Sequence, residues 1–225
     1  MLRGDTTLSG REVFMPTETA QRALSILRDG SQFQWYVITL FALVAYVYAV
    51  EVERRNWSLV FAGLALWGTD WFNEIWNALV FHFTNYAPVW GAPGSTAYLP
   101  LIGLNIEICF MFAVAGIAFT KMLPKDKSAK VLGIPNRLFF AVVDAAFCVF
   151  VEVLLNSVNA LTWEYSWWNT RAPWLIFLVG YFPFFVIAFW VFDMKHVRNK
   201  AVFVGSLLGL DAVCLIIFGA VLKWI

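Results

Sequence analysis

Six long apolar runs dominate this sequence, and each is close to the length of a helix that crosses a lipid bilayer. They cover residues 33–50, 57–83, 97–120, 138–163, 174–192 and 201–222. About 20 apolar residues in a helix cross the roughly 30 Å of hydrocarbon, and helices satisfy their own backbone polar groups there. Hydrophobic residues make up 61% of the chain and charged residues 14%. The sequence therefore predicts an all-α, polytopic membrane bundle of about six transmembrane helices.

The spans leave little chain for any other domain. We expect residues 33–225 to form a single transmembrane domain, preceded by a polar tail over residues 1–32. No apolar h-region occurs in this tail, so a cleaved signal peptide is not expected. Within it, Thr17 is a candidate N-cap for a short interfacial helix. The alternative is a disordered tail.

Basic residues are distributed unevenly between the loops. Ten of the sixteen Lys and Arg fall on the side reached after the first span, mostly in loops 121–137 and 195–200. The two loops on the other side contain only Arg171. The positive-inside rule makes the basic loops cytoplasmic, in a bacterial inner membrane or the endoplasmic reticulum.

Two stretches of the chain match each other. Asn77-Ala78-Leu79 and Asn159-Ala160-Leu161 are identical triplets, and each precedes a loop that runs from Tyr through Trp to Ala-Pro. Without gaps, this alignment places Asp70 on Glu152. The match indicates an internal helix-loop-helix repeat over 57–120 and 138–192, an arrangement whose sites often lie at mid-membrane. Chance and the shared composition of membrane interfaces are the alternative explanation.

Six acidic residues lie within the predicted spans, with no Lys or Arg beside them. Asp70, Glu74 and Asn77 share one helix face, as do Glu152, Asn156 and Asn159. Glu107, Asp144 and Asp211 lie on the same or other spans. Each acid costs at least about 2.5–3.5 kcal/mol at mid-membrane, so we expect these groups to face the bundle interior. The alternative is helix–helix hydrogen bonding, which we favour for Asp144.

A buried acid without a cationic partner is expected to be neutral, to hold a metal, or to bind a cation. No Glu-x-x-His pair of the kind found in carboxylate-bridged metal sites is present, so we predict no metal and no cofactor. The formal net charge of +1 also argues against a nucleic-acid partner. The expected partners are membrane lipids and a lipid-soluble small molecule.

Aromatic residues surround the acids. Trp71 and Trp76 lie beside Glu74. Trp163 follows the second set of polar residues on one helix face, a polar ladder formed by Glu152, Asn156 and Asn159. Aromatic faces stabilise cations, and a neutral carboxylic acid can act as a general acid. This combination suits carbocation chemistry on an isoprenoid.

Two short motifs resemble a known group of enzymes. Asn73-Glu74-Ile75-Trp76 in the second span and Gly209-Leu210-Asp211 in the last are similar to motifs of the integral-membrane terpene cyclases of meroterpenoid pathways. Glu74 and Glu107, on successive spans, more weakly resemble the emopamil-binding, sterol-isomerase-like family. The resemblance implies acid-catalysed cyclisation or isomerisation of a terpenoid, with Glu74 and Asp211 as the acids.

We therefore favour an intramembrane enzyme that protonates an isoprenoid, terpenoid or sterol-like substrate. Glu74 is the expected proton donor, assisted by Asp211 or Glu152. The remaining candidates orient the acids or contact substrate: Asp70, Asn77, Glu107, Asn156, Asn159, Trp71, Trp76 and Trp163. The alternatives are a proton- or cation-coupled transporter and a non-catalytic lipid-binding subunit of a membrane complex.

Overall fold

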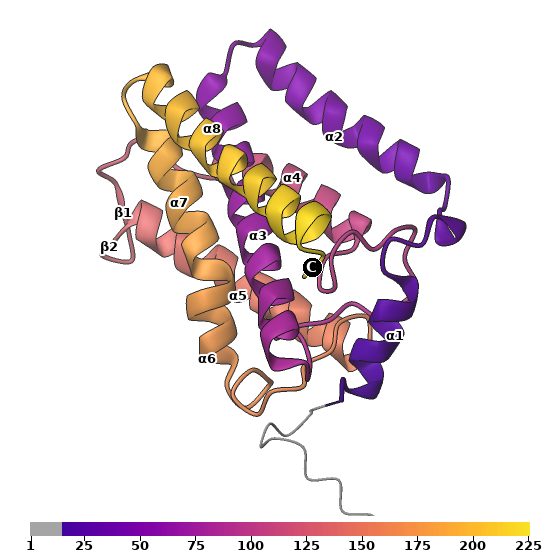
Figure 1. Cartoon of the computed structure of the whole chain (residues 1–225). Helices are drawn as coiled ribbons and strands as arrows, with labels where there is room; N and C mark the ends of the chain where they lie inside the picture. Colours follow the sequence, from indigo (N-terminus) through magenta and orange to yellow (C-terminus); the bar gives the residue numbers. More distant parts are fainter. Residues whose placement is uncertain (1–14) are drawn as a thin grey trace, which may run out of the picture.

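The computed structural model describes residues 15–225, which form a bundle of long helices (Figure 1). The long helices are α2 (Tyr36–Glu53), α3 (Trp57–Thr84), α4 (Ile106–Lys121), α5 (Asn136–Ser157), α6 (Pro173–Leu175) continued through η2 (Ile176–Tyr181) into α7 (Phe182–Asp193), and α8 (Val197–Cys214) continued by η3 (Leu215–Val221). The smaller elements are α1 (Glu18–Ile26), the turn η1 (Gly30–Gln32), and the antiparallel pair β1 (Lys130–Val131) and β2 (Ile134–Pro135).

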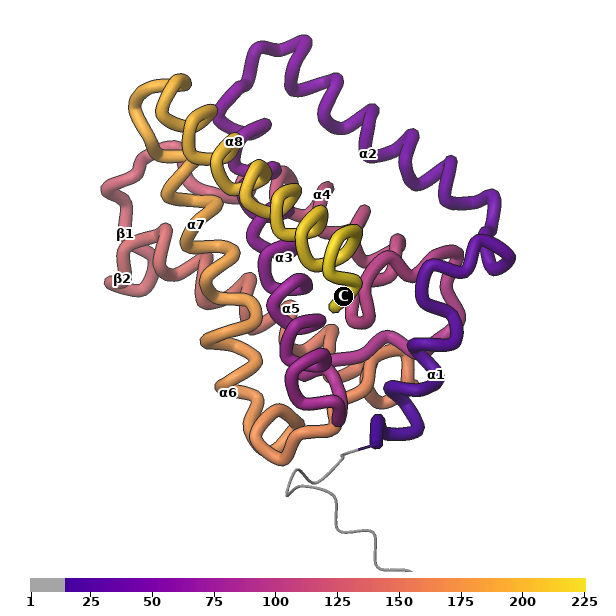
Figure 2. Tube along the Cα trace, viewed as in Figure 1, coloured from indigo at the N-terminus to yellow at the C-terminus, as the bar shows by residue number. Residues whose placement is uncertain are grey.

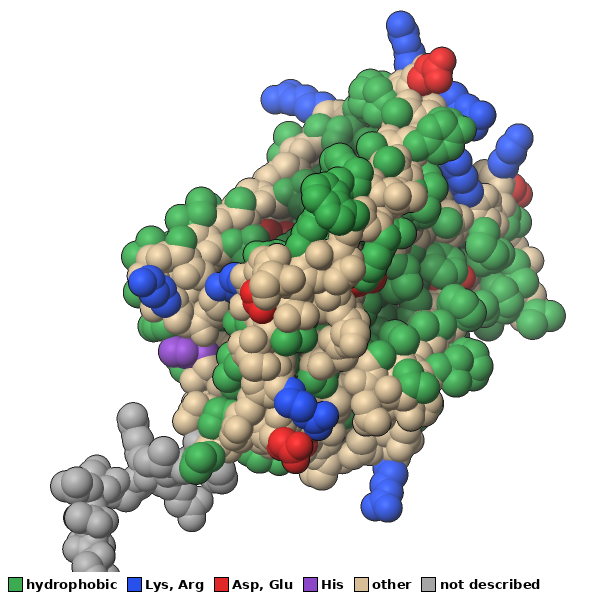
Figure 3. Space-filling view, turned by 90° about the vertical axis from the view of Figure 1, so that its right-hand side faces the viewer, with side chains coloured by type: hydrophobic (Ala, Val, Ile, Leu, Met, Phe, Trp, Pro, Cys, Tyr) green, Lys and Arg blue, Asp and Glu red, His purple; other side chains and the backbone are tan. Residues whose placement is uncertain are grey.

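Four of these helical segments are long and apolar enough to cross a membrane: Tyr36–Glu53, Asn136–Ser157, Pro173–Asp193 and Val197–Val221. The prediction of an all-α membrane bundle is confirmed at this level. The other two long helices differ for separate reasons. The acids and Asn73 lower the mean hydropathy of α3, whereas α4 has only 16 residues. Hydrophobic side chains cover the middle of the face drawn in Figure 3, and basic side chains gather mainly near its ends.

Two of the predicted spans are too long. The span predicted at 97–120 begins as a helix only at Ile106, because the Asn105 side chain caps that helix by accepting a 2.8 Å hydrogen bond from the Ile108 amide. Residues 97–105 instead form a loop whose leucines are buried. The span predicted at 138–163 ends at Ser157, and Asn159 follows in a left-handed conformation with φ +57°. Hydropathy alone does not distinguish a buried loop from a helix.

Helix α3 occupies the centre of the bundle. It packs against α4, α7 and α8 (Figure 2), and 13 of its 28 residues are buried. By contrast, α2 lies at the outside of the bundle and buries only Glu51. The helix that carries the acid ladder is therefore the one with the most protein around it, as the cost of exposing acids to lipid requires.

Two glycines allow α3 and α4 to pack closely. A Cβ atom added to Gly116 on α4 would lie 2.8 Å from the Cα of Gly63 and 3.0 Å from its carbonyl oxygen on α3. Small residues permit such close backbone approach between membrane helices. Because the opposing atoms belong to backbone, a side chain at this crossing could fit only if the helices moved apart.

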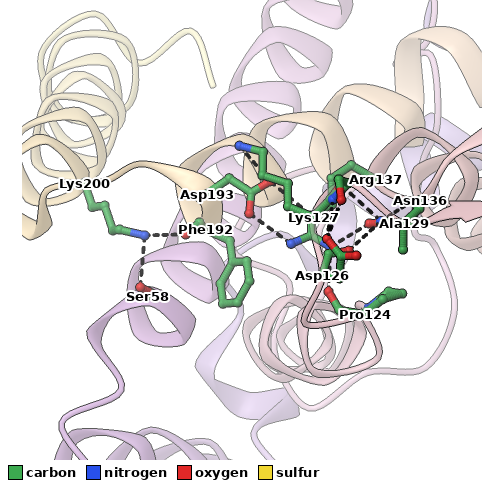
Figure 4. Close-up of polar contacts among 11 residues, drawn as sticks. Ser58, Pro124, Asp126, Lys127, Ala129, Asn136, Arg137, Phe192, Asp193 and Lys200 are labelled. Atoms are coloured by element: carbon green, nitrogen blue, oxygen red, sulfur yellow. Dashed lines mark hydrogen bonds and ion pairs between the residues drawn. The ribbon is translucent and has the colours of Figure 1, made fainter.

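A cluster of ion pairs joins the helix ends near the basic loops (Figure 4). The Arg137 guanidinium at the start of α5 donates two 3.0 Å hydrogen bonds to the carboxylate of Asp193 at the end of α7. Lys127 in the preceding loop lies 3.4 Å from the same carboxylate. The cluster links neighbouring helices at the end of the bundle where basic residues are concentrated.

Lys200 departs from its predicted position in a cytoplasmic loop. It lies in the first turn of α8 and is buried. Its ammonium donates a 3.0 Å hydrogen bond to the Ser58 hydroxyl and a second hydrogen bond to the Phe192 carbonyl (Figure 4). Helix α8 therefore begins at Val197, before the predicted span. Lys200 can be buried in its first turn because protein oxygens accept hydrogen bonds from its ammonium group.

Helix α1 lies across the loops at the opposite end of the bundle. The Thr17 amide donates a 2.9 Å hydrogen bond to the Tyr86 carbonyl, and the Arg28 amide donates one of 2.9 Å to the Leu99 carbonyl. Two residues of α1 itself, Ala20 and Ala23, are buried. Residues 1–14 of the predicted polar tail lie outside the described residues.

We predict that Gly116→Ala destabilises the protein by about 1–3 kcal/mol, as overpacking of a close contact does. Thermal unfolding in detergent measures the change. The matched control is Gly205→Ala in α8, where an added Cβ meets nothing within 4 Å. Because Ala is the better helix former, the control should leave the unfolding temperature unchanged or raise it. Equal stability of the two variants would contradict the role given to the Gly63–Gly116 contact.

Candidate intramembrane acid site

A cavity of about 260 Å³ lies between α3, α4, α5, η2 and α7. Its volume is slightly below the range of about 300–1,000 Å³ usual for ligand pockets. Three acids and many apolar side chains line it, and no Lys or Arg of residues 15–225 does so. The acids are Asp70, Glu74 and Glu152, and the aromatic residues are Trp90, Phe112, Phe119, Phe147, Trp168, Tyr181 and Phe184.

The cavity reaches the apolar outer surface between α4 and α5. These two helices make few direct contacts. Met111 on α4 and Phe147 on α5 both line the cavity, yet they are 46% and 54% exposed. The Phe119 and Phe147 rings touch across the gap with centroids 6.2 Å apart. A hydrophobic molecule could thus enter from the side of the bundle without crossing water.

Glu74 is held by the loop that follows its own helix. Its Oε1 accepts a 2.8 Å hydrogen bond from the indole Nε1 of Trp90. Asn77, one turn further along α3, accepts a 2.7 Å hydrogen bond from the Val89 amide and donates one of 2.7 Å to the Trp90 carbonyl. The ladder residue Asn77 therefore fixes the loop, and the loop fixes the acid.

Glu152 on α5 has a similar arrangement. Its Oε1 accepts a 2.9 Å hydrogen bond from the Trp163 indole, and the Asn156 amide donates one of 3.1 Å to the Leu161 carbonyl. The two loops also pair directly, because Gly91 and Thr162 exchange backbone hydrogen bonds of 3.0 and 2.8 Å. In this pattern of hydrogen bonds Glu74 corresponds to Glu152, whereas the gapless alignment had matched Glu152 with Asp70.

Several carboxylate oxygens in this region are buried without a hydrogen-bond partner among the described residues. They are Glu74 Oε2, Asp70 Oδ2 and both oxygens of Asp211. Asp70 lies near enough to Glu74 and Asp211 for their charges to interact. Asp211 does not line the cavity, so it lies beside the site on α8. The indole Nε1 atoms of Trp71 and Trp168 are likewise buried without a partner among the described residues, so this region contains unpaired donors as well as unpaired acceptors.

Two of the six acids are held elsewhere. Glu107, at the start of α4, accepts hydrogen bonds from the Tyr36 hydroxyl, the Thr96 hydroxyl and the Ala97 amide. It braces the loop before α4 and does not line the cavity. Asp144 is buried on α5 and also lies outside the cavity lining.

The remaining candidates surround the site without lining it. Trp71 packs with Trp67 on the other side of α3, and Trp76 packs against Trp90 with ring centroids 6.0 Å apart. Trp163 donates to Glu152 as described. Asn159 is in the turn after α5, so it does not continue the helical ladder.

The site residues predicted from the sequence do not include Trp90, which bonds Glu74, or several other residues around the acids. Gly103 lies so close that an added Cβ would be 2.7 Å from Glu74 Oε2 and 2.3 Å from Asn77 Nδ2. Trp168 stacks on Trp90 with centroids 5.4 Å apart. Tyr181 ends the π-helical turn η2 and lies near Glu152. The π-helical turn, often found at functional sites, has no signal in the sequence.

Within residues 15–225, no three His, Cys, Asp or Glu side chains are grouped closely enough to hold a metal ion. The site therefore consists of carboxyl groups, indoles and a phenol around an apolar space. Such groups can bind, donate protons and accept them.

Comparison with known proteins places the chain in a family. A model of an uncharacterized membrane protein family matches residues 17–220. The chain belongs to this membrane protein family. An uncharacterized protein of Archaeoglobus fulgidus is 61% identical over 211 residues, which cover 94% of this chain and all of that protein. A shorter protein from the same organism is 53% identical over 53 residues, 24% of this chain and 95% of its own. No solved structure matches.

The family membership corrects the resemblance drawn from short motifs. The matched family and both relatives have no link to the terpene cyclases or to the emopamil-binding family, so the prediction of membership in either was wrong. The neighbouring Glu and Trp of the motif do not interact as a pair in this protein. Glu74 is bonded by Trp90 from the loop and not by its neighbour Trp76.

We predict that Asn77→Ala costs about 2–4 kcal/mol of stability, because backbone groups of Val89 and Trp90 lose buried partners. The measurement is the free energy of unfolding in mixed micelles. Asn73→Ala on the same helix is the control, since its side chain makes only bonds of 3.4 and 3.5 Å. We expect this control to cost less than about 1 kcal/mol. A loss for Asn73→Ala as large as that for Asn77→Ala would refute the bracing role.

Proposed function

We propose that the protein is an intramembrane enzyme that protonates a lipid-soluble substrate in the cavity between α3, α4 and α5. The observation that carries the proposal is the convergence of Asp70, Glu74 and Glu152 on an apolar space open at the outer surface of the bundle. An ionised oxygen without a partner is costly at this depth. The unpaired oxygens therefore favour neutral carboxylic acids, which are proton donors.

Glu74 is the best-placed donor. Trp90 fixes its Oε1, which leaves the unpaired Oε2 beside Gly103 at the cavity wall. Transfer of the Oε2 proton to a substrate double bond forms one C–H bond and leaves a carbocation and a carboxylate. Glu152, on the same cavity and ionised at this step with its Oε1 bonded by the Trp163 indole, takes a proton from a neighbouring carbon. The electrons of that C–H bond form the new double bond, and Glu152 then releases the proton to solvent. Solvent protons then restore Glu74.

The aromatic lining suits a cationic intermediate. Trp90, Trp168 and Tyr181 present ring systems around the acids, and ring faces stabilise positive charge. The lining otherwise offers few polar groups, so water is scarce around the cation. An isoprenoid, terpenoid or sterol-like alkene matches these properties, and cyclisation or isomerisation is the expected reaction.

We predict that Glu74→Gln lowers turnover by about 10²–10⁴-fold, the usual contribution of a general acid. A substrate need not be known in advance. Membranes that contain the protein are incubated in D₂O, where Glu74 exchanges to O–D and delivers deuterium to carbon. Mass spectrometry of the extracted lipids then detects deuterium that has become bonded to carbon.

The matched control is Asp144→Asn, which removes a buried acid of the bundle that does not line the cavity. It should retain the labelling seen with the unaltered protein. Two results would reject the proposal: equal labelling with Glu74→Gln, or no lipid whose labelling depends on the unaltered protein.

We also propose that six helices span the membrane, with the basic loops 121–137 and 195–200 in the cytoplasm. Support for α3 and α4 as spans comes from their packing against three of the four apolar segments, which are α2, the segment that contains α7, and α8. Support for the orientation comes from the gathering of basic residues at one end of the bundle.

A labelling experiment tests this topology. In a background without Cys109, Cys148 and Cys214, a membrane-impermeant maleimide applied to intact cells should label the Arg171→Cys variant. It should label the Lys125→Cys variant only after the membrane is opened. Both positions are exposed loop residues, so the pair differs only in the side of the membrane. Reversed labelling would invert the orientation, and labelling of both in intact cells would reject the single span, α5, that we place between them.

A further inference from the structure

A second cavity lies at the opposite end of the bundle from the ion-pair cluster. Its volume is about 510 Å³, and it is bordered by α1, the end of α3, the loop 97–105 and the segment after η3. Most of its wall is apolar, formed by Leu24, Leu27, Ala78, Phe81, Ile102 and Trp224. Gly219, Ala220 and Ile225 also line it, together with two basic residues, Arg28 and Lys223, and the lining contains no acidic side chain.

The backbone holds both basic residues in an unusual conformation. Arg28 has φ +56° and Lys223 has φ +55°, and each follows the end of a helical segment. Few residues other than glycine adopt this conformation. Hydrogen bonds fix Arg28, whose amide donates to the Leu99 carbonyl at 2.9 Å and whose Nε donates to the Pro100 carbonyl at 3.0 Å. The same left-handed conformation follows α2 at Arg55 and α3 at Asn85, as is usual where a helix ends.

Basic residues are scarce at this end of the bundle. Within residues 15–225 only Arg22, Arg28, Arg171 and Lys223 lie there, and two of these four line one cavity. Neither Arg28 nor Lys223 takes part in an ion pair of the described residues. The adjacent carboxylate of Asp29 accepts hydrogen bonds from the Ser31 amide and hydroxyl instead. The two positive charges therefore form no ion pair within the described chain, and the last residue of the sequence, Ile225, lies in the same lining.

The position of the cavity along the bundle suits a headgroup. Trp224 at its edge stacks on His82 with ring centroids 4.8 Å apart, near the end of α3. Trp side chains commonly lie at the level of lipid headgroups. The apolar wall continues from this edge along α3 and η3, which belong to the helical bundle.

We propose that this cavity binds an anionic membrane lipid, with Arg28 and Lys223 on its phosphate and the start of its hydrocarbon chain against the apolar wall. A guanidinium and an ammonium are the two side chains that bind phosphate best. The apolar wall has no role in binding free phosphate, so the cavity as a whole matches an amphiphile. This proposal is independent of the chemistry assigned to Glu74, since no lining residue of the second cavity is an acid.

Native mass spectrometry of the purified full chain in neutral detergent tests the proposal. Phosphatidylglycerol is the anionic probe, and phosphatidylcholine and inorganic phosphate are the comparisons. We expect a retained phosphatidylglycerol adduct that the double variant Arg28→Gln/Lys223→Gln weakens at least tenfold. The charge-keeping variant Lys223→Arg should retain binding, which separates loss of charge from loss of fold.

The matched control is Arg22→Gln/Arg171→Gln, which removes the other two basic residues at the same end and away from the cavity. Binding should survive in this control. Equal weakening in both double variants would overturn the proposal. It would show that lipid binding depends on the total positive charge at this end of the bundle and not on the two residues of the cavity. Equal retention of phosphatidylcholine, or displacement of the lipid by millimolar inorganic phosphate, would overturn it as well.

Discussion

The rest of the structure depends on the burial of the carboxyl groups of α3 inside a bundle of apolar helices. Asp70 and Glu74 lie on one face of α3, and lipid exposure of either would be costly. Surrounding α3 with α4, α7 and α8 removes that exposure. The helix that carries Asp70, Glu74 and Asn77 thereby becomes the central one, while the apolar α2 and α8 lie with most of their surface outward.

Burial alone would leave the acids without hydrogen bonds, and the loops supply part of what is missing. Trp90 and Trp163 each extend an indole N–H from a loop to a glutamate on the preceding helix. The loops can do this because Asn77 and Asn156 fix their backbones. Asn77 also lies beside the Glu74 carboxyl group, so it can orient this acid directly as well as through the loop. Gly103 lets the neighbouring loop approach closely enough to close the wall.

The sequence was sufficient for the helices and for the gathering of acids on α3 and α5, because hydropathy and helical spacing determine both. It was not sufficient where loop and helix have the same composition. Residues 97–105 are as apolar as a span yet fold as a buried loop. The repeat was aligned in the wrong register for its hydrogen bonds, since α5 ends at Ser157, before the Asn159 that the alignment matched with Asn77 inside α3. Tyr181 enters the site through a π-helical turn that no spacing rule predicts.

The unpaired oxygens separate a structural from a chemical role for the acids. Carboxyl groups that only join helices would be expected to have hydrogen-bond partners, as Glu107 does with Tyr36, Thr96 and Ala97. Glu74 Oε2, Asp70 Oδ2, both oxygens of Asp211 and Asp144 Oδ2 have none among the described residues, and of these four acids only Asp70 and Glu74 line the cavity. Each such group destabilises the fold unless a proton or a ligand neutralises it. The position of Asp70 and Glu74 beside an apolar cavity that reaches the outer surface is therefore better explained by a bound substrate and a transferable proton than by stability.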